Sequence, residues 1–285
     1  MSFSRLDNKI CLITGANSGI GKATTRYLVE LGAHVVMVVR NKEKGENAIA
    51  DIRKYTKHGS MELMLCDFAY QEQIHDLVTQ YKNEYDQLDI LVNNHGIYLS
   101  KKKFTAEHIQ KSFAVNHLGY FLLTNLLLNG VSSYSPGKII NVSSGSYALV
   151  RKWPLDDYNF NKRKYRGFRA YAESKLYNIM FTYSLAKKLK ESGITVNTYS
   201  PGFTNTNLGR NYRGLMKLFL WFSNLIAKSP EEGAKTAKYL AASPETTSIT
   251  GKYFVDCVIQ ETSDLTYRED LQEELWKTSM KLTNL

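Results

Sequence analysis

Tyr171 and Lys175 lie four residues apart in RAYAESKLYN, a segment with a helical pattern that runs from Arg169 to Asn178. Residues at this spacing share one face of a helix, with Cβ atoms about 5–6 Å apart. A lysine ammonium at that distance would stabilise a tyrosine phenolate and lower its pKa from the ordinary value of about 10. The pair is therefore a candidate general acid/base with its tuning cation, although two amphipathic surface residues would show the same spacing.

A glycine-rich loop follows the first strand-like segment and has the spacing G-x-x-x-G-x-G. It reads Thr14-Gly15-Ala16-Asn17-Ser18-Gly19-Ile20-Gly21. Glycines let the backbone approach a pyrophosphate, which then lies on the free N–H groups of the following helix. An isolated loop of this kind is also compatible with a plain tight turn. Its position between a strand and a helix favours a dinucleotide site, and the predicted contacts are Gly15, Asn17, Ser18, Gly19, Ile20 and Gly21.

The end of the second strand distinguishes between two nicotinamide cofactors. Sites for NAD carry an acidic residue there, which binds the ribose 2′-hydroxyl. This chain has Arg40 and Asn41 instead, with Arg40 19 residues after Gly21. A guanidinium can bind a 2′-phosphate that a carboxylate would repel, and Lys22 adds positive charge nearby. We therefore expect NADP(H) rather than NAD(H), the alternative being a solvated surface arginine.

Further cofactor contacts are predicted where later strands end. The Asp67 carboxylate, at the end of the third strand, is placed to meet the adenine amino group. Proline lacks an N–H donor and glycine permits unusual dihedral angles, so the turn after the sixth strand can wrap around a nicotinamide. The alternative is that Asn and Gly serve only as turn residues, since both are common in the turns that follow strands. The candidates are Asp67, Asn94, Gly96, Pro201, Gly202 and Thr204.

Short apolar segments alternate with longer helical patterns along the chain. The expected strands are Lys9–Thr14, Ala33–Val39, Met61–Cys66, Leu88–Val92, Lys138–Val142 and Ile194–Tyr199, with a seventh near Gly251–Val255. The expected helices are Gly19–Leu31, Lys42–Tyr55, Gln71–Glu84, Thr105–Asn129 and Phe168–Glu191. Strands of continuous apolar residues are buried on both faces of a sheet.

This alternation predicts an α/β fold, with a single-domain doubly wound (Rossmann-type) parallel sheet of about seven strands and helices on both faces. The domain would span residues 1–285. Residues 9–130 would form mainly the dinucleotide-binding half, and residues 131–285 the catalytic and substrate-binding half.

Composition narrows the classes of partner and compartment. The net charge of +10 favours anionic partners such as phosphorylated cofactors. The sequence has no nucleic-acid-binding signature, no histidine spacing typical of a metal site and no G-x-S-x-G motif. Three widely spaced cysteines are typical of reduced thiols in the cytoplasm. The N-terminus does not have the pattern of a signal peptide, and we expect no membrane-spanning helix.

Two segments after late strands have unusual composition. Residues Val150–Arg169 combine seven basic and five aromatic residues. This insert is compatible with a solvated loop, a substrate rim or a membrane-surface contact. Residues Leu215–Ile226 are strongly apolar, as expected of core, a lid over substrate or a membrane contact.

In combination and in chain order, these residues resemble the short-chain dehydrogenase/reductase family from Lys9 to about Tyr253. The resemblance rests on Thr14–Gly21, Asp67, Asn93-Asn94-His95-Gly96, Asn116, Ser143-Ser144, Tyr171-x-x-x-Lys175 and Pro201-Gly202. Finer motifs resemble the retinol-dehydrogenase-like branch, namely VNHLG at 115–119, YNF at 158–160, SKLYN at 174–178 and GKYF at 251–254. Two departures from the family are His95, where a small alanine is usual, and the lack of the N-terminal membrane anchor that many members of the branch carry.

The resemblance implies NADP(H)-dependent hydride transfer to or from a lipophilic aldehyde, ketone or alcohol of retinal-like, fatty-aldehyde or steroid type. It implies that Tyr171 is the acid/base, that Lys175 tunes it and reaches the nicotinamide ribose, and that Ser144 hydrogen-bonds the carbonyl oxygen. Asn116 would hold a water for a proton relay through Lys175, unless it is only a polar residue bonded within its helix. The alternatives are a catalytically silent dinucleotide-binding scaffold or redox sensor, and a reductase of small xenobiotic carbonyls. A homodimer and a peripheral membrane contact stay open.

Overall fold

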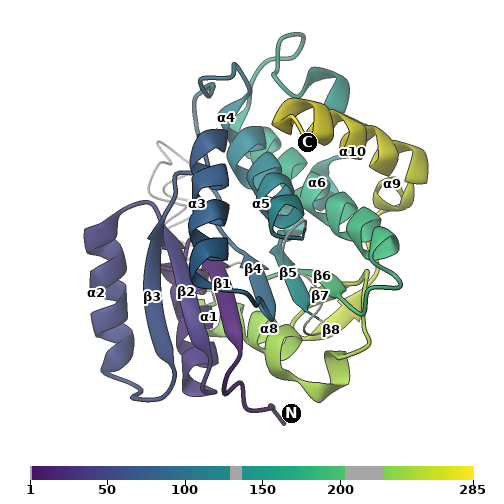
Figure 1. Cartoon of the computed structure of the whole chain (residues 1–285). Helices are drawn as coiled ribbons and strands as arrows, with labels where there is room; N and C mark the ends of the chain where they lie inside the picture. The colour runs from purple at the N-terminus through teal and green to yellow at the C-terminus, as the bar shows by residue number, and fades with distance from the viewer. Residues whose placement is uncertain (1, 129–136, 203–227) are drawn as a thin grey trace.

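The strands form one sheet in the computed structural model, which describes residues 2–128, 137–202 and 228–285 (Figure 1). Their order across the sheet is β3-β2-β1-β4-β5-β6-β7-β8. Their bounds are β1 Ile10–Thr14, β2 His34–Val39, β3 Ser60–Leu65, β4 Ile90–Asn93, β5 Lys138–Val142, β6 Thr195–Ser200, β7 Tyr253–Val255 and β8 Val258–Gln260. All neighbouring pairs from β3 to β7 are parallel, and only β8 runs antiparallel.

The central strands consist almost entirely of apolar residues because both of their faces are covered. Leu12 of β1 pairs with Val36 of β2, and both side chains are fully buried. Their neighbours Cys11 and Val35 are equally buried but contribute to the core on the opposite face of the sheet. Continuous apolar strands of this kind are typical of a parallel sheet between two helical layers.

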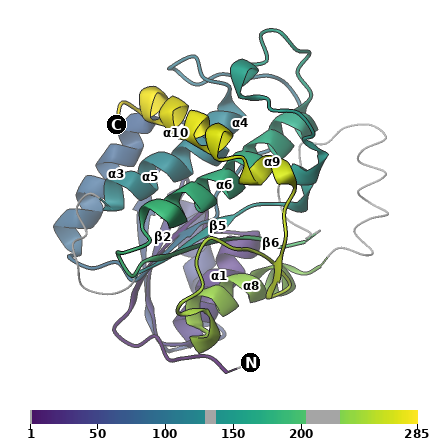
Figure 2. The same cartoon turned by 90° about the vertical axis from the view of Figure 1, so that its right-hand side faces the viewer.

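Helices cover both faces of the sheet (Figures 1 and 2). One layer contains α1 Gly19–Glu30, α2 Lys42–Arg53 and α8 Pro230–Ala242. The other contains α3 Gln71–Glu84, α5 Gly119–Leu128 and α6 Gly167–Lys188. Shorter helices are α4 Lys111–Phe113 and α9 Asp264–Tyr267, and α10 Glu269–Thr283 packs against α6. The predicted doubly wound α/β fold is confirmed.

The structure differs from the sequence-based elements at four places named here. The helix expected from Thr105 begins only at Lys111, because the preceding chain forms an antiparallel bridge between Phe104 and Gln110. Strand β8 was not expected, because it has only three residues, all of them exposed, and so shows no alternation of buried and exposed positions. Helices α8 and α10 were also missed, although Ser229 and Glu232 form a capping box that marks the start of α8.

Parallel pairing determines where the candidate site lies. The carboxyl ends of β1, β4, β5 and β6 lie at one edge of the sheet, so the residues that follow them converge there although they are far apart in sequence. In the parts of the chain that the structure describes, no helix is both long and apolar enough to cross a bilayer.

Candidate active site

The glycine loop after β1 forms a tight backbone cradle at the N-terminus of α1. Gly15 adopts a left-handed conformation with φ of 66°, and its N–H donates to the Val38 carbonyl at 2.9 Å. A Cβ on Gly21 would lie only 2.4 Å from the Gly15 carbonyl oxygen, so the loop has no room for a side chain there. Ser18 precedes α1 without a side-chain capping bond, and the first turn contains no acidic residue. The N–H groups at this helix end are therefore suited to an anion such as a pyrophosphate.

The residues predicted to bind the cofactor at this loop have two different roles. Asn17, Ser18, Gly19 and Ile20 are partly exposed at the loop surface. Asn94 instead supports the loop from the end of β4, because its Nδ2 donates to the Thr14 carbonyl at 2.8 Å and to the Gly15 carbonyl at 3.3 Å. Asn94 therefore holds the cradle in shape, and its amide protons are already used by the protein.

The side chains predicted for the adenosine end of the cofactor meet beyond β2 and β3. Arg40 is 67% exposed, and its Nη1 lies 3.9 Å from Asp67 Oδ2. Asn41 caps α2 with its side-chain oxygen. The Lys22 ammonium is bound to Asp51 at 2.7 Å, and the same carboxylate also binds Lys54 at 2.8 Å, so the additional charge expected from Lys22 is only partly offset. Arg40 is therefore an exposed cation at the end of β2, in a long-range ion pair with Asp67, and its binding of a 2′-phosphate stays a prediction.

Ser144, Tyr171 and Lys175 lie together at the ends of β5 and α6. Ser144 lies two residues after the end of β5 at Val142, and it is the N-cap of the 3-10 turn Gly145–Leu149. Tyr171 and Lys175 are on α6, with the Lys175 Nζ 5.6 Å from the centre of the Tyr171 ring. Lys175 is buried, and its Nζ donates to the Val142 carbonyl at 2.9 Å. The structure thus brings the predicted proton donor, its neighbouring hydroxyl and a cation into one cluster.

Burial controls the titration of this cluster. It raises the pKa of Tyr171 to about 12, and the hydrogen bond with the Ser144 hydroxyl opposes the increase. It lowers the pKa of Lys175 to about 7. Burial therefore determines the direction of the Tyr171 pKa shift in this structure, and the expectation that Lys175 lowers this pKa stays a prediction. At neutral pH the Tyr171 phenol is protonated, which is the form that a general acid requires.

Asn116 lies in a π-helical turn, Ala114–Leu118, and π-turns are frequent at functional sites. Its Oδ1 accepts from the Ile97 N–H at 2.8 Å, and its Nδ2 donates to the Ile97 carbonyl and to Ser174 Oγ, each at 3.0 Å. The Ser174 hydroxyl in turn donates to the Tyr171 carbonyl at 2.7 Å. Asn116 is therefore not bonded within its own helix. It fixes α6 relative to the chain after Gly96, and its part in a proton relay stays a prediction.

Gly96 and the turn after β6 complete the described part of the cluster. A Cβ on Gly96 would lie 3.5 Å from Asn116 Oδ1 and 3.8 Å from Lys175 Nζ, so glycine leaves the space above both groups open. Pro201 directly follows β6, and Gly202 adopts a left-handed φ of 73°. Thr204 and the apolar segment 215–226 lie outside the described residues. Among the described residues, no group of three or more potential metal ligands occurs.

His95, the departure from the usual small residue, is buried and bridges two parts of the cluster. Its Nε2 lies 2.9 Å from the Val115 carbonyl, and its Nδ1 lies 2.8 Å from Thr14 Oγ1. Burial lowers the pKa of His95 to about 3, so the ring is neutral. Since a carbonyl can only accept, Nε2 is the donor, and Nδ1 accepts from the Thr14 hydroxyl. The ring also stacks on Phe68 with centroids 3.5 Å apart. His95 thus joins the glycine-loop strand to the π-turn of Asn116.

The substitution His95→Ala is expected to lower the free energy of unfolding by about 2 kcal/mol, because it removes a packed ring and leaves buried polar groups unpaired. The effect is measured by urea denaturation. The control is His75→Ala, at an exposed position of α3, which should change the free energy by less than about 0.5 kcal/mol. Equal stability of the two variants would show that the His95 bridge contributes no net stabilisation.

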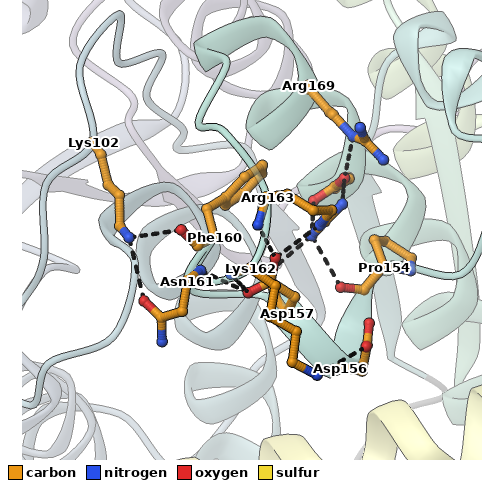
Figure 3. Close-up of polar contacts among 10 residues, drawn as sticks. Lys102, Pro154, Asp156, Asp157, Phe160, Asn161, Lys162, Arg163 and Arg169 are labelled. Atoms are coloured by element: carbon orange, nitrogen blue, oxygen red, sulfur yellow. Dashed lines mark hydrogen bonds and ion pairs between the residues drawn. The ribbon is translucent and has the colours of Figure 1, made fainter.

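The basic-aromatic insert is folded around a buried ion-pair network (Figure 3). Arg163 Nε donates to Asp157 Oδ2 at 2.9 Å, and Arg163 Nη1 donates to Glu173 Oε1 at 2.7 Å. Arg169 Nε also donates to Glu173 Oε1, at 3.0 Å. Both carboxylates are almost completely buried. The core of this insert is therefore not a solvated loop, although several of its basic side chains are exposed.

This network connects the insert to the helix of Tyr171. Glu173 lies on α6 two residues after Tyr171, and Asp157 lies in the insert. Sequence reasoning assigned Glu173 no role, although its spacing of four from Arg169 was a signal of an ion pair. The spacing alone does not show that Arg163 of the insert also binds Glu173 and connects it to Asp157.

Comparison with known proteins gives consistent matches. The family model described as short chain dehydrogenase matches residues 9–154 and 159–215. Human retinol dehydrogenase 12 is 37% identical, over 99% of this chain and 88% of the relative. A solved structure of an uncharacterized protein from Mycobacterium paratuberculosis has a TM-score of 0.78 at 27% identity, covering 99% of this chain and 96% of that one.

A second solved structure is a short chain dehydrogenase from Burkholderia cenocepacia in complex with NADP. It has a TM-score of 0.69 and covers 88% of this chain and 97% of that chain. Its sequence identity to this chain is 24%, so this likeness concerns the fold alone.

Proposed function

Because the chain belongs to the short-chain dehydrogenase/reductase family, and is therefore an oxidoreductase of the dehydrogenase/reductase class, we propose that it transfers a hydride between NADP(H) and a lipophilic carbonyl or alcohol. The observation that carries the proposal is the convergence of Ser144, Tyr171 and Lys175 beside the glycine cradle. Such a cluster places a proton donor, a second hydroxyl and a cation at one point, next to a site suited to a pyrophosphate.

The residues of the cradle fit a nicotinamide dinucleotide. The absence of space for a side chain at Gly21 and the uncapped N-terminus of α1 suit a pyrophosphate, and Arg40 suits a 2′-phosphate. When bound, the cofactor would supply or accept the hydride. Asn94 would support it indirectly by holding the glycine loop.

Carbonyl reduction requires that a proton reach the oxygen as the hydride reaches the carbon. The protonated Tyr171 phenol would give that proton, and the Ser144 hydroxyl would donate a second hydrogen bond that orients the oxygen. Lys175 would stabilise the phenolate that remains. Asn116 would hold α6 and the chain after Gly96 in fixed positions relative to each other, through its hydrogen bonds to Ile97 and Ser174.

The substrate class is supported by two observations. The relative at 37% identity is named a retinol dehydrogenase, so its substrate is a lipophilic alcohol. In this chain the exposed apolar side chains Leu149 and Phe168 lie near the ends of the segments that carry Ser144 and Tyr171. The direct test is NADPH oxidation by the purified protein with a panel of retinal, fatty aldehydes, steroids and small polar carbonyls. Turnover confined to small polar carbonyls would contradict the lipophilic class.

The preference for NADP(H) is tested by Arg40→Ala. We expect the Kd of NADPH to increase by about tenfold to a hundredfold, while the Kd of NADH changes by less than about twofold, because only NADPH carries the 2′-phosphate. Both constants are measured by fluorescence titration. Lys277→Ala, which removes an equally exposed cation from α10, is the control and should leave both constants unchanged. Tighter binding of NADH than of NADPH to the wild-type protein would overturn the assignment.

A further inference from the structure

A cavity of about 520 Å³ opens beside the N-terminus of α6, and its lining combines apolar and cationic side chains. The apolar side includes Leu149 and Phe168, which are 64% and 42% exposed. The cationic side consists of Arg151, Lys152, Arg166 and Arg169. Exposed apolar and cationic side chains in one cavity suit a ligand that has both an apolar part and an anionic group.

The cavity adjoins the two segments that carry the candidate catalytic residues. Leu149 ends the 3-10 turn that begins after Ser144. Phe168 lies three residues before Tyr171 on α6, so the two side chains project from neighbouring positions of one helix face. Arg166 is the residue that precedes α6, and Ala172, which also lines the cavity, directly follows Tyr171 in the helix. The cavity therefore lies next to the position of Tyr171 on α6, although Tyr171 itself is not among its lining residues.

Most of the positive charge in the cavity is not compensated by the protein. Arg169 is bound to Glu173. For Arg151, Lys152 and Arg166, the described parts of the chain provide no carboxylate within ion-pair distance. The first turn of α6 also contains no acidic residue, and its helix dipole adds positive potential.

Neighbouring like charges repel one another, and an anion bound between them relieves that repulsion. By contrast, Arg163 of the same insert donates hydrogen bonds to two buried carboxylates, those of Asp157 and Glu173. The protein therefore neutralises the cation that holds the insert together and leaves three of the four cations that line the cavity, Arg151, Lys152 and Arg166, without a carboxylate partner among the described residues. This difference favours a site for an anionic group over a uniformly solvated basic face.

We propose that this cavity binds the anionic group of an amphipathic substrate, whose apolar chain passes Leu149 and Phe168 and whose carbonyl carbon reaches Tyr171. The anion would be a carboxylate or a phosphate held by Arg151, Lys152 and Arg166. This inference rests on the proposed function, because it specifies the substrate class of the same active site.

The test uses a series of unbranched ω-oxo carboxylic acids of increasing chain length, each paired with its methyl ester. With NADPH and the wild-type protein, the acid of best-fitting length should have a kcat/KM about tenfold higher than its ester. This preference should decrease at high salt, which screens exposed charges. The triple variant Arg151→Gln, Lys152→Gln, Arg166→Gln should lose the preference and leave kcat/KM for the ester within about twofold. Lys164→Gln, which removes an exposed cation of the insert outside the cavity lining, is the control and should keep the preference.

Failure of the inference and failure of the proposed function give different results. Calorimetric titration of each acid and ester into the protein loaded with NADP+, which cannot reduce an aldehyde, measures the preference without turnover. Equal Kd values for acid and ester would overturn the anion site, whether or not the aldehydes are reduced. Absence of turnover with every carbonyl would instead contradict the proposed function. Equal Kd values combined with loss of binding of the triple variant to phosphatidylserine vesicles would assign the cations to a membrane surface and overturn the inference.

Discussion

The substitution Tyr171→Phe is expected to lower kcat for carbonyl reduction by about a thousandfold, within the range that general acid catalysis contributes. The substitution removes only the phenolic hydroxyl, which is protonated at neutral pH because burial raises the pKa of Tyr171 to about 12. The Kd of NADPH should change by less than about twofold. Single-turnover measurements of NADPH fluorescence separate the chemical step from binding.

A matched control lies on the same helix. Tyr177 is fully buried on α6, and its Oη forms no hydrogen bond with the described residues. Tyr177→Phe therefore makes the same chemical change without removing a partner of the reacting oxygen, and kcat should stay within about twofold of the wild type. If both variants retained wild-type turnover, Tyr171 would not be the acid. If the wild type bound NADPH and reduced no carbonyl, the catalytically silent scaffold would be the better interpretation.

The same pKa of Tyr171 gives the two reaction directions different dependences on pH. Alcohol oxidation requires the phenolate, and below a pKa of about 12 the phenolate fraction increases tenfold for each pH unit. The oxidation rate should therefore increase with pH across the neutral and mildly alkaline range. Carbonyl reduction requires the phenol, which stays protonated over that range. Tyr171→Phe should abolish the increase in the oxidation direction.

The candidate site could be predicted to a large extent because strand ends are visible in the sequence. Each parallel strand is an apolar segment, and its carboxyl end must lie at the same edge of the sheet as the others. Gly15, Asn94 and Ser144 therefore belong together although they are up to 129 residues apart. The same argument fails for β8, an exposed three-residue strand whose position depends on pairing with β7 and not on its own pattern.

Other features could not be predicted because they depend on packing. The Tyr171 pKa was expected to be low from the spacing of Lys175, but burial is a property of the whole fold and raises it. His95 was only a departure from a motif in the sequence. Its bonds to Thr14 and Val115 require that three distant segments meet, and a Cβ on Gly119 would approach its ring to 2.9 Å. Neither the burial nor the partners of such a residue can be derived from its neighbours in the chain.

The insert provides the second large expected effect. Asp157→Ala should lower the free energy of unfolding by about 3–5 kcal/mol, the usual result of removing one partner of a buried ion pair. The carboxylate also accepts three backbone N–H groups, those of Asn161, Lys162 and Arg163, at 2.6, 3.0 and 3.0 Å. Its loss leaves these donors and the Arg163 guanidinium without their acceptor. Urea or thermal denaturation measures the change.

Asp156 offers a control at the adjacent position. Its side chain is 67% exposed, and its ion pair with Lys162 is 3.5 Å long, so Asp156→Ala should cost at most about 1 kcal/mol. Because Arg163 also holds Glu173 on the helix of Tyr171, Asp157→Ala should in addition raise KM for the carbonyl substrate, whereas Asp156→Ala should not. If both variants lost the same small amount of stability, the network would be a surface feature. A large loss at Asp157 alone would instead show that the insert forms part of the support of the active-site helix.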